Sequence, residues 1–234
     1  MCPINENLIL TGNDKGHVAF WDLRKSFKKP VSYDDKTHDD CITDISVEGN
    51  DKYAHCTSGD GTMSTFNLKK LGKLHVRSEP EIECDFLSVC SIDDAQKVVV
   101  GTQEGEVLVY NYKEYGCSSD RIPGHVGTID TICGYEGNIV LTGSEDGVIR
   151  ALHVNPSRYL GIVGKHDEDV LRIVLTGGED EDQCASLDVN GVVKFWDLSC
   201  LQQVIQTQFK PILSFYDLLI PFELNISKSP SPCI

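Results

Sequence analysis

Residues 10–22 read LTGNDKGHVAFWD, which is an apolar strand, a short polar turn with a glycine, and a second strand ending in aromatic residues. The pattern returns as CTSGDGTMSTFN over 56–67, VVGTQEGEVLVYN over 99–111, LTGSEDGVIRALH over 141–153 and ASLDVNGVVKFWD over 185–197. The turn glycines lie 45, 44, 42 and 44 residues apart, at Gly16, Gly61, Gly105, Gly147 and Gly191. A period of about 40–45 residues with four strands per unit predicts an all-β propeller of repeated blades.

The residue types in each copy have physical reasons. Glycine takes the positive φ that a tight hairpin turn requires. Five residues after the turn glycine, each copy has a large apolar side chain that can pack between blades; these residues are Trp21, Phe66, Tyr110, Leu152 and Trp196. His38, His125 and His166 precede strands where blades of the WD-repeat type often carry histidine. We expect each to brace its own blade by hydrogen bonds, because one histidine per blade cannot converge on a metal.

The repeat also predicts the domain organisation. Residues 1–206 form a partial propeller of about four and a half four-stranded blades, as an open arc or a small closed ring. We expect a half blade over 5–24, blades over about 30–68, 73–112, 118–154 and 158–198, and an extra strand over 201–206. The short strands are expected to line the central channel; they are Pro30–Tyr33, Lys73–Val76, Arg121–Pro123 and Tyr159–Val163. Residues 207–234 are expected to form a divergent, poorly ordered tail, in which apolar 209–222 is either a closing or partner-binding strand or a divergent end.

Composition limits the function. The net charge of −15 argues against direct binding of nucleic acid, whose phosphates require clustered Lys and Arg, and favours protein partners. No membrane span and no secretory signal is evident, so the ten cysteines are interpreted as intracellular thiols.

No catalytic, metal-binding or cofactor-binding motif is present, which predicts a protein that is not an enzyme and carries no cofactor; a propeller hydrolase is a remote alternative. Acidic residues 167–169 and 179–182 are either a solvated loop face or a rim that attracts a basic partner.

Several stretches resemble the WD repeat-containing protein 55 family, and together they cover about residues 5–205. They include 7–25, CTSGDG at 56–61 with FNLK at 66–69, RSEP at 77–80, TGSEDGVIRA at 142–151 and VKFWD at 193–197. The resemblance implies a nuclear, nucleolar scaffold for ribosome biogenesis that serves maturation of large-subunit ribosomal RNA, with pre-ribosomal factors as partners. The early blades and the C-terminal extension of that family have no counterpart here.

A second resemblance concerns Trp21, Asp22 and Arg24. The run WDLR over 21–24 is similar to the W-D-x-R box of WD-repeat proteins that dock on the adaptor of cullin-RING ubiquitin ligases. Arg24 could offer its planar guanidinium to a partner carboxylate. The alternative function is therefore a ligase substrate receptor, while the simpler interpretation of Arg24 is a solvated strand end.

Overall fold

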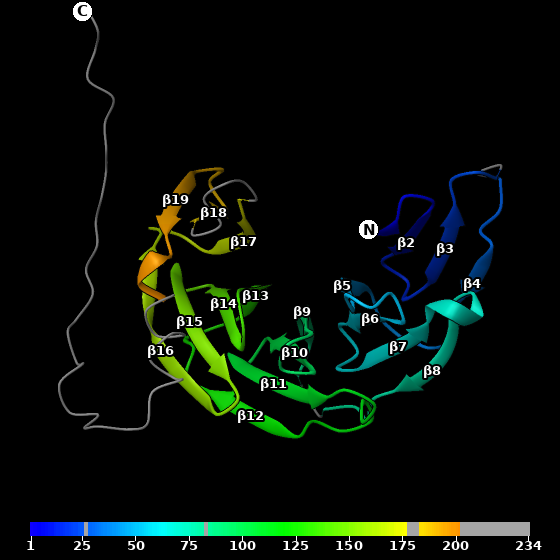
Figure 1. Cartoon of the computed structure of the whole chain (residues 1–234), viewed down its shortest axis with the longest axis horizontal. Coiled ribbons are helices and arrows are strands. Elements are labelled where there is room, and N and C mark those ends of the chain that lie inside the picture. Colours follow the sequence, from blue (N-terminus) through cyan, green and yellow to red (C-terminus); the bar gives the residue numbers. More distant parts are fainter. Residues whose placement is uncertain (26–27, 82–83, 177–182, 202–234) are drawn as a thin grey trace, which may run out of the picture.

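The computed structural model describes residues 1–25, 28–81, 84–176 and 183–201, which are almost entirely β-strand. Five antiparallel sheets follow one another as an open arc (Figure 1). Sheet 1 contains four strands, β1 (Cys2–Asn5), β2 (Leu8–Gly12), β3 (Val18–Asp22) and β4 (Ser32–Asp34). Sheet 2 contains β5 (Ile42–Val47), β6 (Tyr53–Ser58), β7 (Met63–Asn67) and β8 (Lys73–Arg77), with the short 3-10 helix η1 (Leu68–Lys70) between the last two.

Sheets 3 to 5 repeat the arrangement. Sheet 3 contains β9 (Phe86–Ile92), β10 (Lys97–Thr102), β11 (Glu106–Asn111) and β12 (Asp120–Pro123). Sheet 4 contains β13 (Ile129–Gly134), β14 (Ile139–Ser144), β15 (Val148–Val154) and β16 (Ser157–Lys165). Sheet 5 has three strands among the described residues, β17 (Val170–Leu175), β18 (Gln183–Asp188) and β19 (Val193–Asp197). The prediction of an all-β, partial WD-type propeller is therefore confirmed, and no sheet is closed.

The structure groups the strands differently from the predicted units. Sheet 1 is not a half blade, because Cys2–Asn5 and Ser32–Asp34 flank its two central strands. Each short strand, such as Ser32–Asp34, pairs with the sheet before it and not with the strands that follow. The predicted units over 30–68, 73–112, 118–154 and 158–198 therefore each begin one strand before a sheet does. Of the predicted extra strand over 201–206, only Leu201 is described, and it is buried; the tail over 207–234 lies outside the described residues.

The short strands do not line the centre of the arc, which was a wrong expectation. The first strands of neighbouring sheets contact one another, β5 with β9, β9 with β13, and β13 with β17. Figure 1 shows β8, β12 and β16 on the outside of the arc. Side chains also join the inner strands, since the Thr43 hydroxyl donates to the Phe86 carbonyl at 2.7 Å and the Ser88 hydroxyl donates to the Ile129 carbonyl at 2.9 Å. The first strand of each interior sheet thus lies between the neighbouring sheets and is bonded to them.

Neighbouring sheets are held together by shared apolar cores. Sheets 1 and 2 bury Phe20 against Phe66, whose ring centroids are 5.7 Å apart at 67°. Sheets 3 and 4 share a core that includes Val109 and Leu152, and sheets 4 and 5 share one that includes Ala151. Each interior sheet therefore buries both faces, as the repeated apolar positions predicted.

Candidate interaction surface

One end of the sheets carries the turns between second and third strands, together with the segments that connect one sheet to the next. We call this end the turn rim. Its turn glycines fit tightly beneath the connecting segments: a Cβ on Gly147 would lie 2.5 Å from the His166 carbonyl oxygen, and its φ is +74°. The other four repeat glycines also have positive φ, and three of them approach a connecting segment in the same way; the four are Gly16, Gly61, Gly105 and Gly191. The repeat thus builds a continuous rim from turns and connections.

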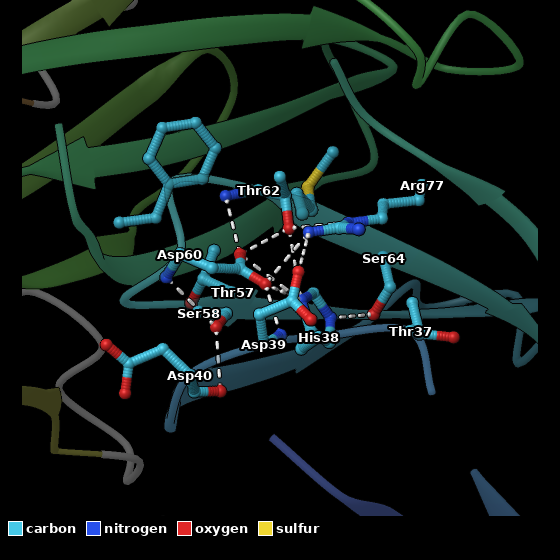
Figure 2. Close-up of polar contacts among 12 residues, drawn as sticks. Thr37, His38, Asp39, Asp40, Thr57, Ser58, Asp60, Thr62, Ser64 and Arg77 are labelled. Carbon is cyan, nitrogen blue, oxygen red and sulfur yellow. Dashed lines mark hydrogen bonds and ion pairs between the residues drawn. The ribbon is translucent and has the colours of Figure 1, made fainter. Parts of the chain in front are cut away.

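The connecting segment before sheet 2 is tied to the turn by a buried polar cluster (Figure 2). His38 Nδ1 lies 3.2 Å from Asp60 Oδ2, and His38 Nε2 lies 2.6 Å from Ser64 Oγ. Arg77 of β8 adds an ion pair to the same carboxylate at 3.0 Å. Burial would raise the pKa of the Asp60 carboxyl, but hydrogen bonds from His38, Thr62 and a backbone amide hold it well below its usual range. Asp60 is therefore charged and neutralised within the fold.

Sheet 5 carries the fullest version of this arrangement. The Trp196 indole N–H donates to Ser186 Oγ at 2.7 Å, and that hydroxyl lies 2.6 Å from His166 Nε2. His166 Nδ1 lies 3.0 Å from Asp188 Oδ2. Since a carboxylate only accepts hydrogen bonds, His166 donates through Nδ1 and accepts from the serine through Nε2 when neutral. The chain of hydrogen bonds fixes the turn, two strands and the connecting segment relative to one another.

His125 occupies the corresponding place before sheet 4 but has other partners. Its Nε2 lies 2.7 Å from Thr142 Oγ1, and its Nδ1 lies 3.0 Å from the Tyr159 hydroxyl. The turn carboxylate, Asp146, is instead paired with Arg150 at 2.6 Å. Burial, together with the positive charge of Arg150, lowers the pKa of His125 to about 4.

This depressed pKa predicts a pH dependence of stability. His125 stays neutral in the folded chain to about pH 4, whereas in the unfolded chain it takes up a proton near its ordinary pKa of about 6.5. Its contribution is complete above about pH 6.5 and is lost as the pH falls towards 4, with a loss on the order of 3 kcal/mol. Urea unfolding between pH 7 and 4 should show a shallower decline for His125→Gln than for the wild type. Identical slopes would contradict a neutral, buried His125.

The predicted partner-binding residues Trp21, Asp22 and Arg24 lie at the end of β3, away from the turn rim. The Trp21 indole donates to Thr11 Oγ1 at 2.9 Å, a contact equivalent to that of Trp196 with Ser186. Arg24 folds back on Asp22 with two hydrogen bonds of 2.9 Å, from Nε and from Nη2. Hydrogen bonds from Arg24 lower the pKa of Asp22 to about 2. The planar edge of Arg24 that a partner carboxylate would use is therefore already occupied.

The structure also shows how deeply the other predicted packing residues and cysteines are buried. Phe66, Tyr110 and Leu152 are buried between sheets, whereas Trp21 and Trp196 are half-buried. Cys56 and Cys184 are buried free thiols, and Cys90 and Cys133 are half-buried. Among the described residues no group of three His, Cys, Asp or Glu side chains could hold a metal ion.

Sequence reasoning missed a second buried polar cluster at the opposite end of the sheets. Glu48 is 1% exposed and accepts a hydrogen bond from the Tyr115 hydroxyl at 2.6 Å. His55 Nε2 lies 3.4 Å from the same carboxylate oxygen, and His55 Nδ1 lies 3.0 Å from Thr65 Oγ1. Tyr115 comes from sheet 3, so the cluster joins two sheets. No local sequence pattern predicts this cluster, because Glu48 and Tyr115 are 67 residues apart in sequence.

The turn rim carries exposed carboxylates beyond those in the buried clusters. In the described part of the chain, the exposed rim carboxylates without an ion pair include Asp14, Asp40, Glu104, Glu145, Asp167 and Glu168. Figure 2 shows the Asp40 carboxylate directed away from the cluster around Asp60. The opposite rim is mixed, because Lys52, Lys69, Lys70 and Lys113 lie near its turns. The turn rim also carries Lys15 and Lys36, but its carboxylates outnumber them, so it is the more acidic of the two rims among the described residues.

The sequence matches curated relatives over most of its length. It is 32% identical over 212 residues to rat WD repeat-containing protein 55, which covers 88% of this chain and 52% of the relative. The chain is related to the WD repeat-containing protein 55 family. The Drosophila erecta homolog of WD repeat-containing protein 55 is 36% identical over 83% of this chain, and WD repeat-containing protein JIP5 of Coprinopsis cinerea is 40% identical over 73%. No family model matches the chain.

The chain spans about half the length of the WD repeat-containing protein 55 relatives it matches. Together with the five sheets, the match supports a WD-repeat scaffold for protein interactions, of a class that is generally not catalytic. No helix of the described residues is long and apolar enough to cross a membrane.

Proposed function

We propose that this chain is a non-enzymatic scaffold that binds basic segments of partner proteins through its turn rim. The observation that carries the proposal is the row of exposed, unneutralised carboxylates along that rim. Summed like charges on a surface raise the local concentration of oppositely charged partners and speed their association. Hairpin turns and the connecting segments packed on them hold these carboxylates in place, so the partner does not have to order the surface on binding.

The cellular role we propose is ribosome biogenesis, in maturation of large-subunit ribosomal RNA, with the nucleolus and nucleus as its location. The family resemblance supports this role, and the acidic rim is compatible with it, because proteins that bind RNA phosphates are rich in Lys and Arg. The same charge makes direct contact with RNA unfavourable, so the partners we propose are pre-ribosomal proteins and not the RNA itself.

Proximity labelling of the whole chain in cells tests this role. We expect enrichment of nucleolar pre-ribosomal proteins over a free labelling enzyme, and no binding of the purified chain to ribosomal RNA fragments in a polarisation assay at physiological salt. A labelled set without pre-ribosomal proteins would contradict the cellular role. Tight RNA binding by the purified chain would contradict the protein-scaffold mechanism.

The ligase-receptor alternative has weaker support from the geometry. Arg24 would have to leave Asp22, which is 6% exposed in its side chain, before it could bind a partner carboxylate. We therefore expect Arg24→Ala to leave the recovered partner proteins unchanged in quantitative affinity purification. Lys28→Ala is a matched control, because Lys28 is another exposed cation near this strand end. Selective loss of a cullin-RING adaptor with Arg24→Ala would favour the ligase role.

A further inference from the structure

The contacts between sheets follow one rule along the arc. On the third strand of sheets 1, 3 and 4, the residue before the repeat aromatic packs towards the next sheet; in sheet 2 this place is taken by the buried Thr65, whose Oγ1 lies 3.0 Å from His55 Nδ1. Phe20 does so against Phe66, and its ring lies over Gly72, where an added Cβ would be 2.4 Å away. Val109 packs in one core with Leu152, and Ala151 in one core with Trp196. We call the sheet face that carries this residue the donor face, and the face of the next sheet that it packs against the acceptor face; the two terms describe side-chain packing and not hydrogen bonds.

The donor face of sheet 5 is uncovered among the described residues. Phe195 is the counterpart of Phe20 in the repeat, yet it is 67% exposed where Phe20 is 3% exposed. Val193 is 54% exposed and Val174 is 48% exposed. The three side chains share one face, because Phe195 pairs with Ala185, Ala185 pairs with Val174, and Val193 lies two residues before Phe195. An exposed apolar face of this kind usually marks an interface.

The acceptor face of sheet 1 is the matching surface at the other end of the arc. Trp21 is the counterpart of Phe66, and it lines an open depression with Lys29, Pro30 and Tyr33. Pro30 precedes β4 much as Gly72 precedes β8, and Gly72 is where the Phe20 ring rests. The depression therefore occupies the place that receives the donor aromatic in the contact between sheets 1 and 2.

The charges beside the two surfaces are opposite. Lys29 borders the depression, while Asp197 is exposed two residues after Phe195 and so on the same face. At one end of the arc the exposed Phe195 lies beside Asp197, and we call this side chain the knob. At the other end the depression around Trp21 lies beside Lys29, and we call this depression the hollow.

We propose that the chain associates head to tail with a second copy of itself, with Phe195 of one copy seated in the depression around Trp21, Pro30 and Tyr33 of the other. The contact repeats the packing of Phe20 on sheet 2. It is heterologous, so each copy keeps one free donor face and one free acceptor face unless the copies close into a ring.

Sedimentation velocity of the whole chain over a hundredfold concentration range tests the proposal. The wild type is expected to shift to a larger species as concentration rises, while Phe195→Glu and Tyr33→Glu each remain monomeric over the same range. Val126→Glu is the matched control, since Val126 is 70% exposed on the connection between β12 and β13, away from both faces. This control should associate like the wild type.

A mixture of the two variants separates head-to-tail contact from other modes. Phe195→Glu keeps an intact hollow and Tyr33→Glu keeps an intact knob, so an equimolar mixture should form one dimer with no larger species. A wild type that stays monomeric at every concentration would overturn the proposal and point to a cover within its own chain. Association that both variants retain, or that the mixture does not restore, would overturn it as well.

Discussion

Gly147→Ala is expected to lower the free energy of unfolding by about 3 kcal/mol. Two effects contribute. An alanine at φ +74° adopts the left-handed conformation that L residues avoid, and its Cβ would lie 2.5 Å from the His166 carbonyl oxygen. The connecting segment would have to move, which disturbs the turn rim.

Gly191→Ala separates the two effects. Gly191 has φ +80°, but nothing lies within 4 Å of an added Cβ. Its loss should be only the conformational cost, about 1 kcal/mol. Urea unfolding of both variants, followed by tryptophan fluorescence, measures the difference. Equal losses would contradict the tight fit between turn and connecting segment.

His166→Ala is expected to destabilise the chain by about 3 kcal/mol, because the buried Asp188 carboxylate and the buried Ser186 hydroxyl each lose a hydrogen bond and the link between them is removed. Asp188 and Ser186 are both at most 3% exposed, so water cannot replace the lost hydrogen bonds without opening the sheet. The measurement is again urea unfolding at neutral pH.

His75→Ala is the control for that loss, since His75 lies exposed on β8. Its ring packs on Tyr53 at a centroid distance of 4.9 Å, so its removal should cost no more than about 1 kcal/mol. A His166→Ala loss no larger than that of the control would show that the hydrogen-bonded chain from Trp196 to Asp188 does not brace sheet 5.

The period of the sequence predicted the central hairpin of every sheet, because strand–turn–strand signals are local. It did not predict which sheet each short strand joins. Ser32–Asp34 lies between two hairpins in sequence, and only its pairing with β3 assigns it to sheet 1. The short strand Cys2–Asn5 was missed because four residues with a proline carry little strand signal.

The histidines before the strands were predicted from the sequence, but the arginines that pair with the turn carboxylates were not. Arg150 could have been found, because it lies four residues after Asp146 and on the same hairpin. Arg77 could not, since it reaches Asp60 from the strand after next. The exposure of Phe195 could not be predicted from the sequence either. The repeat places Phe195 at a buried position, and only the arrangement of the sheets shows that it is exposed.

We propose that the turn rim is the surface that binds basic partner proteins. The most direct test of this proposal is quantitative affinity purification of a rim variant in which Asp14, Glu104 and Asp167 are each changed to Lys. The matched variant changes Asp94, Glu114 and Glu136 to Lys on the opposite rim, with the same change in net charge. We expect the turn-rim variant to lose about tenfold or more of its partner proteins while the opposite-rim variant keeps them. Equal recovery by the two variants, both folded, would contradict the claim.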